Sequence, residues 1–321
     1  MHAISTATYP TSYADPLPCP LCHAESNALA VAEGGIEKRF NMPVLPTRDY
    51  YQAQCANCGL LYINVPVKQD YLDTLYSQES VNWATEYLGS ADVAMNNDER
   101  ARFSTIVDIV AKAKALKGVH WLDFGCQTGE LGADAMKKHG VIMSGVEISD
   151  DYAERATRLW GRDRNVVNSS LDGHHGSQFD VISSLETLEH LAEPWEMLQS
   201  MKQFLADDGV LVVSVPSSDY FIVKYHIFKT VRKIFNREKV KARPESSGPS
   251  IYGLCHTHLY NFTPKSLSLL LERGGFRVES IRGIGWLSRY WIFSKIARVI
   301  ELATGGHIAI FPSVLAVARK M

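Results

Sequence analysis

The stretch VHWLDFGCQTG, residues 119–129, decides the fold of this chain. It begins as an apolar strand, reaches an acidic residue at Asp123 and bends through two glycines, where backbone can approach a ligand closely because glycine has no side chain. A second apolar run at 141–148 delivers Glu147 to its end, about where open α/β sheets place the carboxylate that binds ribose hydroxyls. Together the two strand ends predict a pocket for a ligand that contains a nucleoside.

Helical and extended patterns alternate around this stretch, which predicts a parallel sheet flanked by helices. We expect helices at 98–115, 130–139, 151–160, 194–205 and 264–273, and later strands at 210–215, 276–281 and 313–318. Pro194 suits a first helical turn, and Gly274-Gly275 marks a helix end.

The glycines at 125, 129 and 132 do not form G-x-G-x-x-G, which disfavours a dinucleotide. Four motifs instead follow one another in an order that resembles the class I S-adenosylmethionine-dependent methyltransferases: D-x-G-C-x-T-G, V-E-I-S, F-D-V-I and L-E-H-L, which begin at residues 123, 146, 179 and 188. The resemblance covers roughly residues 95–321. It implies an α/β fold with a Rossmann-like seven-stranded sheet, an antiparallel edge formed by the last two strands, and S-adenosyl-L-methionine as cofactor.

The resemblance also implies which residues bind that cofactor. Gly125 and Gly129 would form the turn beneath the methionine part, Asp123 would support it, and Glu147 would bind the ribose. The full expected set is Asp123, Gly125, Cys126, Gly129, Glu147, Ile148, Leu171, Asp172 and Leu185, of which Leu171 or Asp172 would border the adenine. Gln127 stands where many members carry a second glycine, and glutamine is a poor choice if that position needs a positive φ.

Composition limits the classes of protein and partner. With 321 residues, 46% hydrophobic content and a net charge of −2, the chain is long enough for one large domain and a smaller module, and it has no global attraction to nucleic acid. We expect no DNA partner and disfavour RNA. The N-terminus lacks a secretory pattern and no apolar run reaches 18 residues, which predicts a cytoplasmic protein.

Four of the six cysteines form two C-x-x-C knuckles, at Cys19 and Cys22 and at Cys55 and Cys58. Two such knuckles suit a closed tetrahedral S4 shell, so they predict a structural Zn²⁺ site in a small zinc-ribbon module. A redox pair or two disulfides are the alternatives. The expected domains are the module at 1–65, a linker or helical cap at 66–98, and a methyltransferase domain at 99–321. A four-cysteine module before such a domain resembles bacterial sugar and natural-product methyltransferases.

A cluster of carboxylates and histidines follows the fourth core strand, where ligands gather in such sheets. Glu186, Glu189 and His190 form E-x-x-E-H, and His258 lies on a later segment. The pattern resembles small-RNA 2′-O-methyltransferases and ubiquinone O-methyltransferases, in which a divalent ion holds the substrate hydroxyls. Three interpretations of this cluster are open. It could form a second metal site, for Mg²⁺ or Mn²⁺. His190 or His258, with Glu189 beside them, could instead act as general base, or the cluster could be purely structural.

An insertion at 217–257 contains eight basic residues between Lys224 and Arg243, against one acid. Its apolar residues recur at near-helical spacing, which predicts an amphipathic helix. Such a segment would cap the acceptor pocket and contact a phosphate-bearing acceptor or an anionic membrane surface, or it would simply be a solvated lid.

The leading functional hypothesis is O-methylation of a small or carrier-linked saccharide, such as a nucleotide-sugar. A lipid, quinone or other natural-product acceptor is the alternative within enzymes. A protein of another class, an inactive scaffold that keeps the fold, is the third hypothesis.

Overall fold

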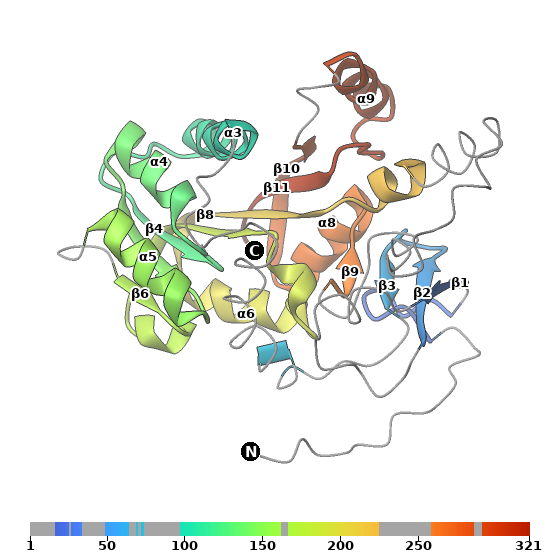
Figure 1. Cartoon of the computed structure of the whole chain (residues 1–321), viewed down its shortest axis with the longest axis horizontal. Helices are drawn as coiled ribbons and strands as arrows, with labels where there is room; N and C mark the ends of the chain where they lie inside the picture. The colour runs from blue at the N-terminus through green and yellow to red at the C-terminus, as the bar shows by residue number, and fades with distance from the viewer. Residues whose placement is uncertain are drawn as a thin grey trace, which may run out of the picture.

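The computed structural model describes residues 17–25, 27–33, 49–63, 69, 72–73, 97–161, 166–224, 258–285 and 291–321. Its main body is a seven-stranded sheet in the order β10-β11-β8-β7-β4-β5-β6 (Figure 1). The strands are β4 (His120–Phe124), β5 (Ile142–Val146), β6 (Val166–Asn168), β7 (Phe179–Leu185), β8 (Leu205–Pro216), β10 (Phe276–Ile284) and β11 (Ser313–Lys320).

The strands from β6 to β8 run parallel, and β11 runs antiparallel between β8 and β10. The expected Rossmann-like sheet with its antiparallel edge is therefore confirmed. Its strand order reverses between β4 and β7, so a crevice for ligands is expected beyond the carboxyl ends of these two strands.

Helices cover both faces of this sheet. They are α3 (Asn97–Ala113), α4 (Glu130–His139), α5 (Asp150–Trp160), α6 (Pro194–Phe204), α8 (Pro264–Arg273) and, near the β10 end, α9 (Trp291–Ala303). Alternation along the strands divides the core: Trp121 packs with α3, α4 and α5, whereas Leu122 packs with α6 and α8. Among the described helices, none is long and apolar enough to cross a bilayer.

A second sheet contains the N-terminal strands in the order β1-β2-β3-β9. Its members are β1 (Asn27–Glu33), β2 (Asp49–Cys55), β3 (Leu61–Ile63) and β9 (Tyr260–Asn261). The edge strand β9 comes from the C-terminal half of the chain and pairs antiparallel with β3. The expected module at 1–65 is thus continued by a strand from beyond the insertion, and the two parts of the protein share one sheet.

Most element bounds agree with the sequence expectations to within two residues. Helix α8 matches at both ends because Thr263 and Ser266 form a capping box and Pro264 occupies the first turn. The main difference is β8, which begins at Leu205 rather than at 210. Leu205 already pairs with Phe179 of β7, and the next pair is Val210 with Val181, so the register between the two strands shifts in between. The strand therefore contains an irregularity at the residues that the sequence predicts as a turn.

Candidate active site

The glycine-rich bend after β4 lies at the point where the sheet order reverses. Gly125 has a φ of 76°, and a Cβ there would collide with the side chain of Thr187 on the loop after β7. Gly129 has a φ of 88° and caps the start of α4. Both glycines are required by their positive φ and by close packing, of Gly125 against Thr187 and of Gly129 against Ala156 and Trp160.

Gln127 also adopts a positive φ, of 46°, a left-handed conformation that costs a residue with a Cβ about 1 kcal/mol or more. Its amide nitrogen donates a 2.8 Å hydrogen bond to Oε2 of Glu147. The position does need the conformation that glycine adopts easily, and the bond to Glu147 comes from the backbone, so it does not depend on the glutamine side chain.

Glu147 follows the end of β5 and is 8% exposed. Its other oxygen accepts a 2.9 Å bond from the Ser149 amide. Burial raises the pKa of Glu147, and these backbone donors oppose that rise by stabilising the carboxylate. A carboxylate has about four acceptor positions, so both oxygens retain capacity for the two hydroxyls of a ribose.

Asp123 lies within β4 and is buried. Ser183 donates a 2.6 Å hydrogen bond to it, and Trp121 Nε1 donates a 2.8 Å bond to Ser183. Desolvation raises the pKa of Asp123 to about 7, with a smaller contribution from the nearby Glu147 charge. The chain of donors orients this carboxyl beneath the bend.

The remaining residues of the expected cofactor set are placed as follows. Leu185, the last residue of β7, and Leu171, in the 3-10 turn after β6, are buried, whereas Asp172 and Ile148 are exposed. Cys126 is buried, and its sulfur blocks the space that a Cβ on Gly145 would need. Burial raises the pKa of the Cys126 thiol, which agrees with a packing role rather than a reactive one.

The E-x-x-E-H motif divides into two parts in the structure. Glu186 has a φ of 51° and forms a 2.6 Å ion pair with Arg102 of α3, while Ser214 of β8 also donates to it. Arg102 and Ser214 were not anticipated from the sequence. They lie 84 and 28 positions from Glu186, and no local pattern links such residues.

Glu189, His190 and His258 form the other part, with one potential ligand atom of each lying within 4.8 Å of the others. The rings of His190 and His258 meet edge to face at 4.4 Å between centroids, and His190 Nε2 lies 3.8 Å from Glu189 Oε1. Three of the four residues expected to hold a second metal are therefore together, and Glu186 lies outside the group.

Glu189 is fully buried, and among the described residues neither of its oxygens has a hydrogen-bond partner. Desolvation, followed by the Glu186 charge, raises its pKa well above the usual range. Burial lowers the pKa of His258 to about 4, so its ring is neutral near pH 7. A buried carboxyl without donors, beside two imidazoles, has the donor set that a divalent cation would satisfy.

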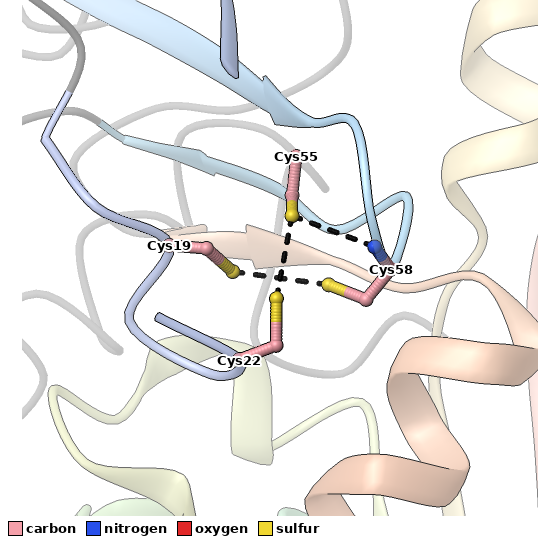
Figure 2. Close-up of side chains that lie close together, drawn as sticks. All are labelled: Cys19, Cys22, Cys55 and Cys58. Carbon is pink, nitrogen blue, oxygen red and sulfur yellow. Dashed lines mark hydrogen bonds between the residues drawn. The ribbon is translucent and has the colours of Figure 1, made fainter. Parts of the chain in front are cut away.

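The four N-terminal cysteines point their sulfurs toward one another (Figure 2). Sγ of Cys19 and of Cys58 are 3.8 Å apart, and Sγ of Cys22 and of Cys55 are 3.4 Å apart. These separations exceed the length of a disulfide bond, about 2.05 Å, and match the roughly 3.8 Å expected between sulfurs of a tetrahedral shell with Zn–S bonds of about 2.3 Å. The residues fit a structural zinc ion.

The charges of the cysteine cluster support the same fit. A hydrogen bond with the Cys58 thiol lowers the pKa of Cys19 to about 5, and the same contact, with burial, raises the pKa of Cys58. Four crowded thiols cannot all ionise without a cation to compensate them.

The basic part of the insertion lies almost entirely outside the described residues, which include only its first turns up to Lys224. The expected amphipathic helix and its contacts therefore remain predictions.

Comparison with known proteins adds three findings. A family profile described as "Methyltransferase domain" matches residues 96–281, more than half of the chain. Ubiquinone biosynthesis O-methyltransferase from Coxiella burnetii is 27% identical over 199 residues, which cover 60% of this chain and 79% of that protein.

Solved structures with a similar fold include the [4+2]-cyclase SpnF, with a TM-score of 0.51 and 17% identity over 79% of this chain and 97% of that one. Magnesium protoporphyrin IX methyltransferase from Synechocystis PCC 6803, solved with bound SAH, has a TM-score of 0.49 and 14% identity over 78% of this chain and 100% of that one. At these identities the likeness concerns the fold alone.

Proposed function

Because this chain belongs to the methyltransferase-domain family and is an S-adenosylmethionine-dependent methyltransferase, we propose that it transfers the methyl group to a hydroxyl oxygen of its acceptor. The observation that supports an oxygen acceptor best is the buried Glu189 with His190 and His258, placed just beyond β7. Such a group can bind a hydroxyl and take up its proton. Asp123 lies in β4, and Gly125 and Glu147 directly follow β4 and β5, so these expected cofactor residues lie at the same carboxyl edge of the sheet as the loop after β7.

In the proposed reaction the acceptor oxygen displaces the sulfonium methyl in one step. The O–C bond forms as the S–C bond breaks, the S–C electron pair stays on sulfur, and S-adenosylhomocysteine leaves. The bend at 125–129 and Glu147 hold the donor, so alignment supplies much of the acceleration. His190 or His258 accepts the hydroxyl proton.

A divalent ion, Mg²⁺ or Mn²⁺, fits the same three residues. Glu189 would hold it with one or both of its unbonded oxygens, and His190 and His258 would complete the protein ligands. When bound, the ion would lower the pKa of an acceptor hydroxyl.

The acceptor class is proposed from relatives and from chemistry. The named relative acts in ubiquinone biosynthesis, which favours a hydroxylated quinone precursor as the first candidate. A saccharide or nucleotide-sugar is the second, supported by the four-cysteine module. The basic residues between Lys224 and Arg243 suit a phosphate-bearing or membrane-carried form of either acceptor.

Mass spectrometry of reactions with hydroxylated quinone precursors and with nucleotide-sugars tests this proposal. One class should gain a methyl group on oxygen. Glu189→Gln should lose turnover on the order of 100-fold or more and keep its affinity for S-adenosylhomocysteine, whereas Glu196→Gln, on the exposed side of α6, should behave as wild type. Full activity of the Glu189→Gln variant would contradict the assigned role.

We also propose that the four cysteines bind one structural Zn²⁺. Metal analysis of the purified protein should find about one zinc per chain, and the combined Cys19→Ser and Cys58→Ser variant should lose it. Chelation that stops turnover while this zinc stays bound would support the separate divalent site at Glu189; full turnover in the chelator would eliminate that site.

A further inference from the structure

Residues 258–263, here called the active-site strap, lie between the cysteine module and the carboxyl edge of the main sheet. On the active-site side, the Leu259 amide donates a 2.8 Å hydrogen bond to the Glu189 carbonyl, and the Phe262 amide donates one of 2.8 Å to Pro216. His258 begins the strap and contacts His190. The place of the His258 ring therefore depends on where the strap backbone is held.

The other side of the strap is held by the cysteine module. The amide of Ile63, the last residue of β3, donates a 3.0 Å hydrogen bond to the Leu259 carbonyl, and β3 pairs with β9 within the strap. The Leu259 carbonyl thus accepts a hydrogen bond from the cysteine module, and the Leu259 amide donates one to the loop that contains Glu189. This one residue connects the two sides through its backbone.

Side chains fix the second cysteine knuckle to the end of the strap. Thr263 Oγ1 donates a 2.8 Å hydrogen bond to the carbonyl of Cys58, and Lys265 Nζ donates a 2.6 Å bond to the carbonyl of Asn57. Gly59 is required here, because a Cβ at that position would collide with Thr263. The knuckle and the start of α8 are therefore in direct contact.

The cofactor residues are held differently. Asp123, Gly125 and Glu147 belong to β4, β5 and the bends after them, and they are oriented by Ser183, Thr187 and the backbone of 127 and 149. A change in the cysteine module should consequently affect the acceptor side of the site before it affects cofactor binding.

We propose that the metal-bound cysteine module positions His258 against Glu189 and His190, and that Thr263 is the residue that transmits this positioning. The inference rests on the proposed zinc ion and on the proposed role of the histidines. Loss of the metal releases the second knuckle, the strap loses its outer support, and the acceptor side of the site loses its geometry while the cofactor side keeps its own.

Thr263 offers a matched pair of variants because it has two separable functions. Its side chain caps α8 by accepting from the Ser266 amide, and it donates to Cys58. Thr263→Asp keeps a good cap but replaces the donor with a carboxylate that cannot donate. Thr263→Ser keeps both functions and serves as the conservative control.

Hydrogen–deuterium exchange of the strap amides, which needs no turnover, is the primary measurement on the full chain. In Thr263→Asp the amides of Leu259 and Phe262 should exchange about tenfold faster or more, with zinc content and S-adenosylhomocysteine affinity within twofold of wild type. Thr263→Ser should match wild type. Where turnover is measurable, kcat should fall with strap protection in the first variant only.

Unchanged strap exchange in Thr263→Asp would overturn the inference, and so would an equal loss of S-adenosylhomocysteine binding, which indicates general destabilisation. If that variant does not fold, zinc is removed from the wild-type protein with a chelator and the same amides are followed. Strap protection that persists without zinc would overturn the inference as well. If the wild-type protein transferred no methyl group, only the proposed function would be contradicted. The hydrogen–deuterium exchange of the strap does not depend on turnover and would still test the positioning of His258.

Discussion

The buried carboxyl of Asp123 gives this protein a pH dependence of stability opposite in sign to that of a salt-bridged carboxylate. Its pKa rises from an ordinary 3.8 to about 7 on folding, chiefly through desolvation. The folded state therefore binds this proton more tightly than the unfolded chain does. The contribution of Asp123 to the free energy of unfolding is complete below about pH 4 and is lost as the pH rises toward about 7.

The expected magnitude follows from linkage. While only the folded state is protonated, the free energy of unfolding falls by about 1.4 kcal/mol per pH unit. The slope decreases near pH 7, where the folded carboxyl is half ionised, so about 2 kcal/mol is lost between pH 5 and pH 7. Asp123→Asn cannot ionise and retains an acceptor for Ser183. The stability of this variant relative to wild type should therefore improve by about 2 kcal/mol over that interval.

Urea unfolding followed by circular dichroism at three pH values in one buffer system measures this difference. Using the difference between variant and wild type removes the contributions of the other titrating groups. Asp172→Asn, the same substitution at an exposed position, is the control variant. A stability difference for Asp123→Asn that stays constant from pH 5 to pH 7 would refute the reasoning.

Three further outcomes are expected. Glu147→Gln should weaken S-adenosylhomocysteine binding by about 1–3 kcal/mol, measured by calorimetry, because a carboxylate acceptor becomes a neutral amide; unchanged affinity would remove Glu147 from the ribose site. Gly125→Ala should destabilise the fold and lower cofactor affinity together, since a Cβ collides with Thr187 and the φ is positive; wild-type melting and binding would count against the close approach. Arg102→Met should cost about 1–3 kcal/mol in urea unfolding, because Glu186 loses its ion-pair partner; a neutral result would mean that water replaces the arginine.

The main sheet could be predicted because its determinants are local. Each determinant occupies only a few consecutive residues: the glycines with positive φ, Glu147 at the end of a strand, and the helix capped by Thr263. The order of the four sequence motifs along the chain also resembles that of class I methyltransferases. The cysteine cluster was equally readable, since two C-x-x-C knuckles bring their own turns.

What could not be predicted depends on contacts between distant residues. Strand β9 has two residues, too few for any periodic pattern, and it forms only because β3 provides a partner. Arg102 looks like one more charge on an amphipathic helix until the fold places it beside Glu186. The separation of Glu186 from the histidine group likewise arises from the turn after β7, where its positive φ directs the side chain to α3.

The pairing of β3 with β9 also affects how the chain can be made. Thr263 and Cys58 are 205 positions apart, so a ribosome that has synthesised the N-terminal strands holds an incomplete sheet until β9 has also been synthesised. An unfinished sheet exposes an unsatisfied edge, which invites association with other nascent chains. Recombinant fragments that stop before residue 258 should therefore aggregate, and truncation from the N-terminus should be equally harmful to the remainder.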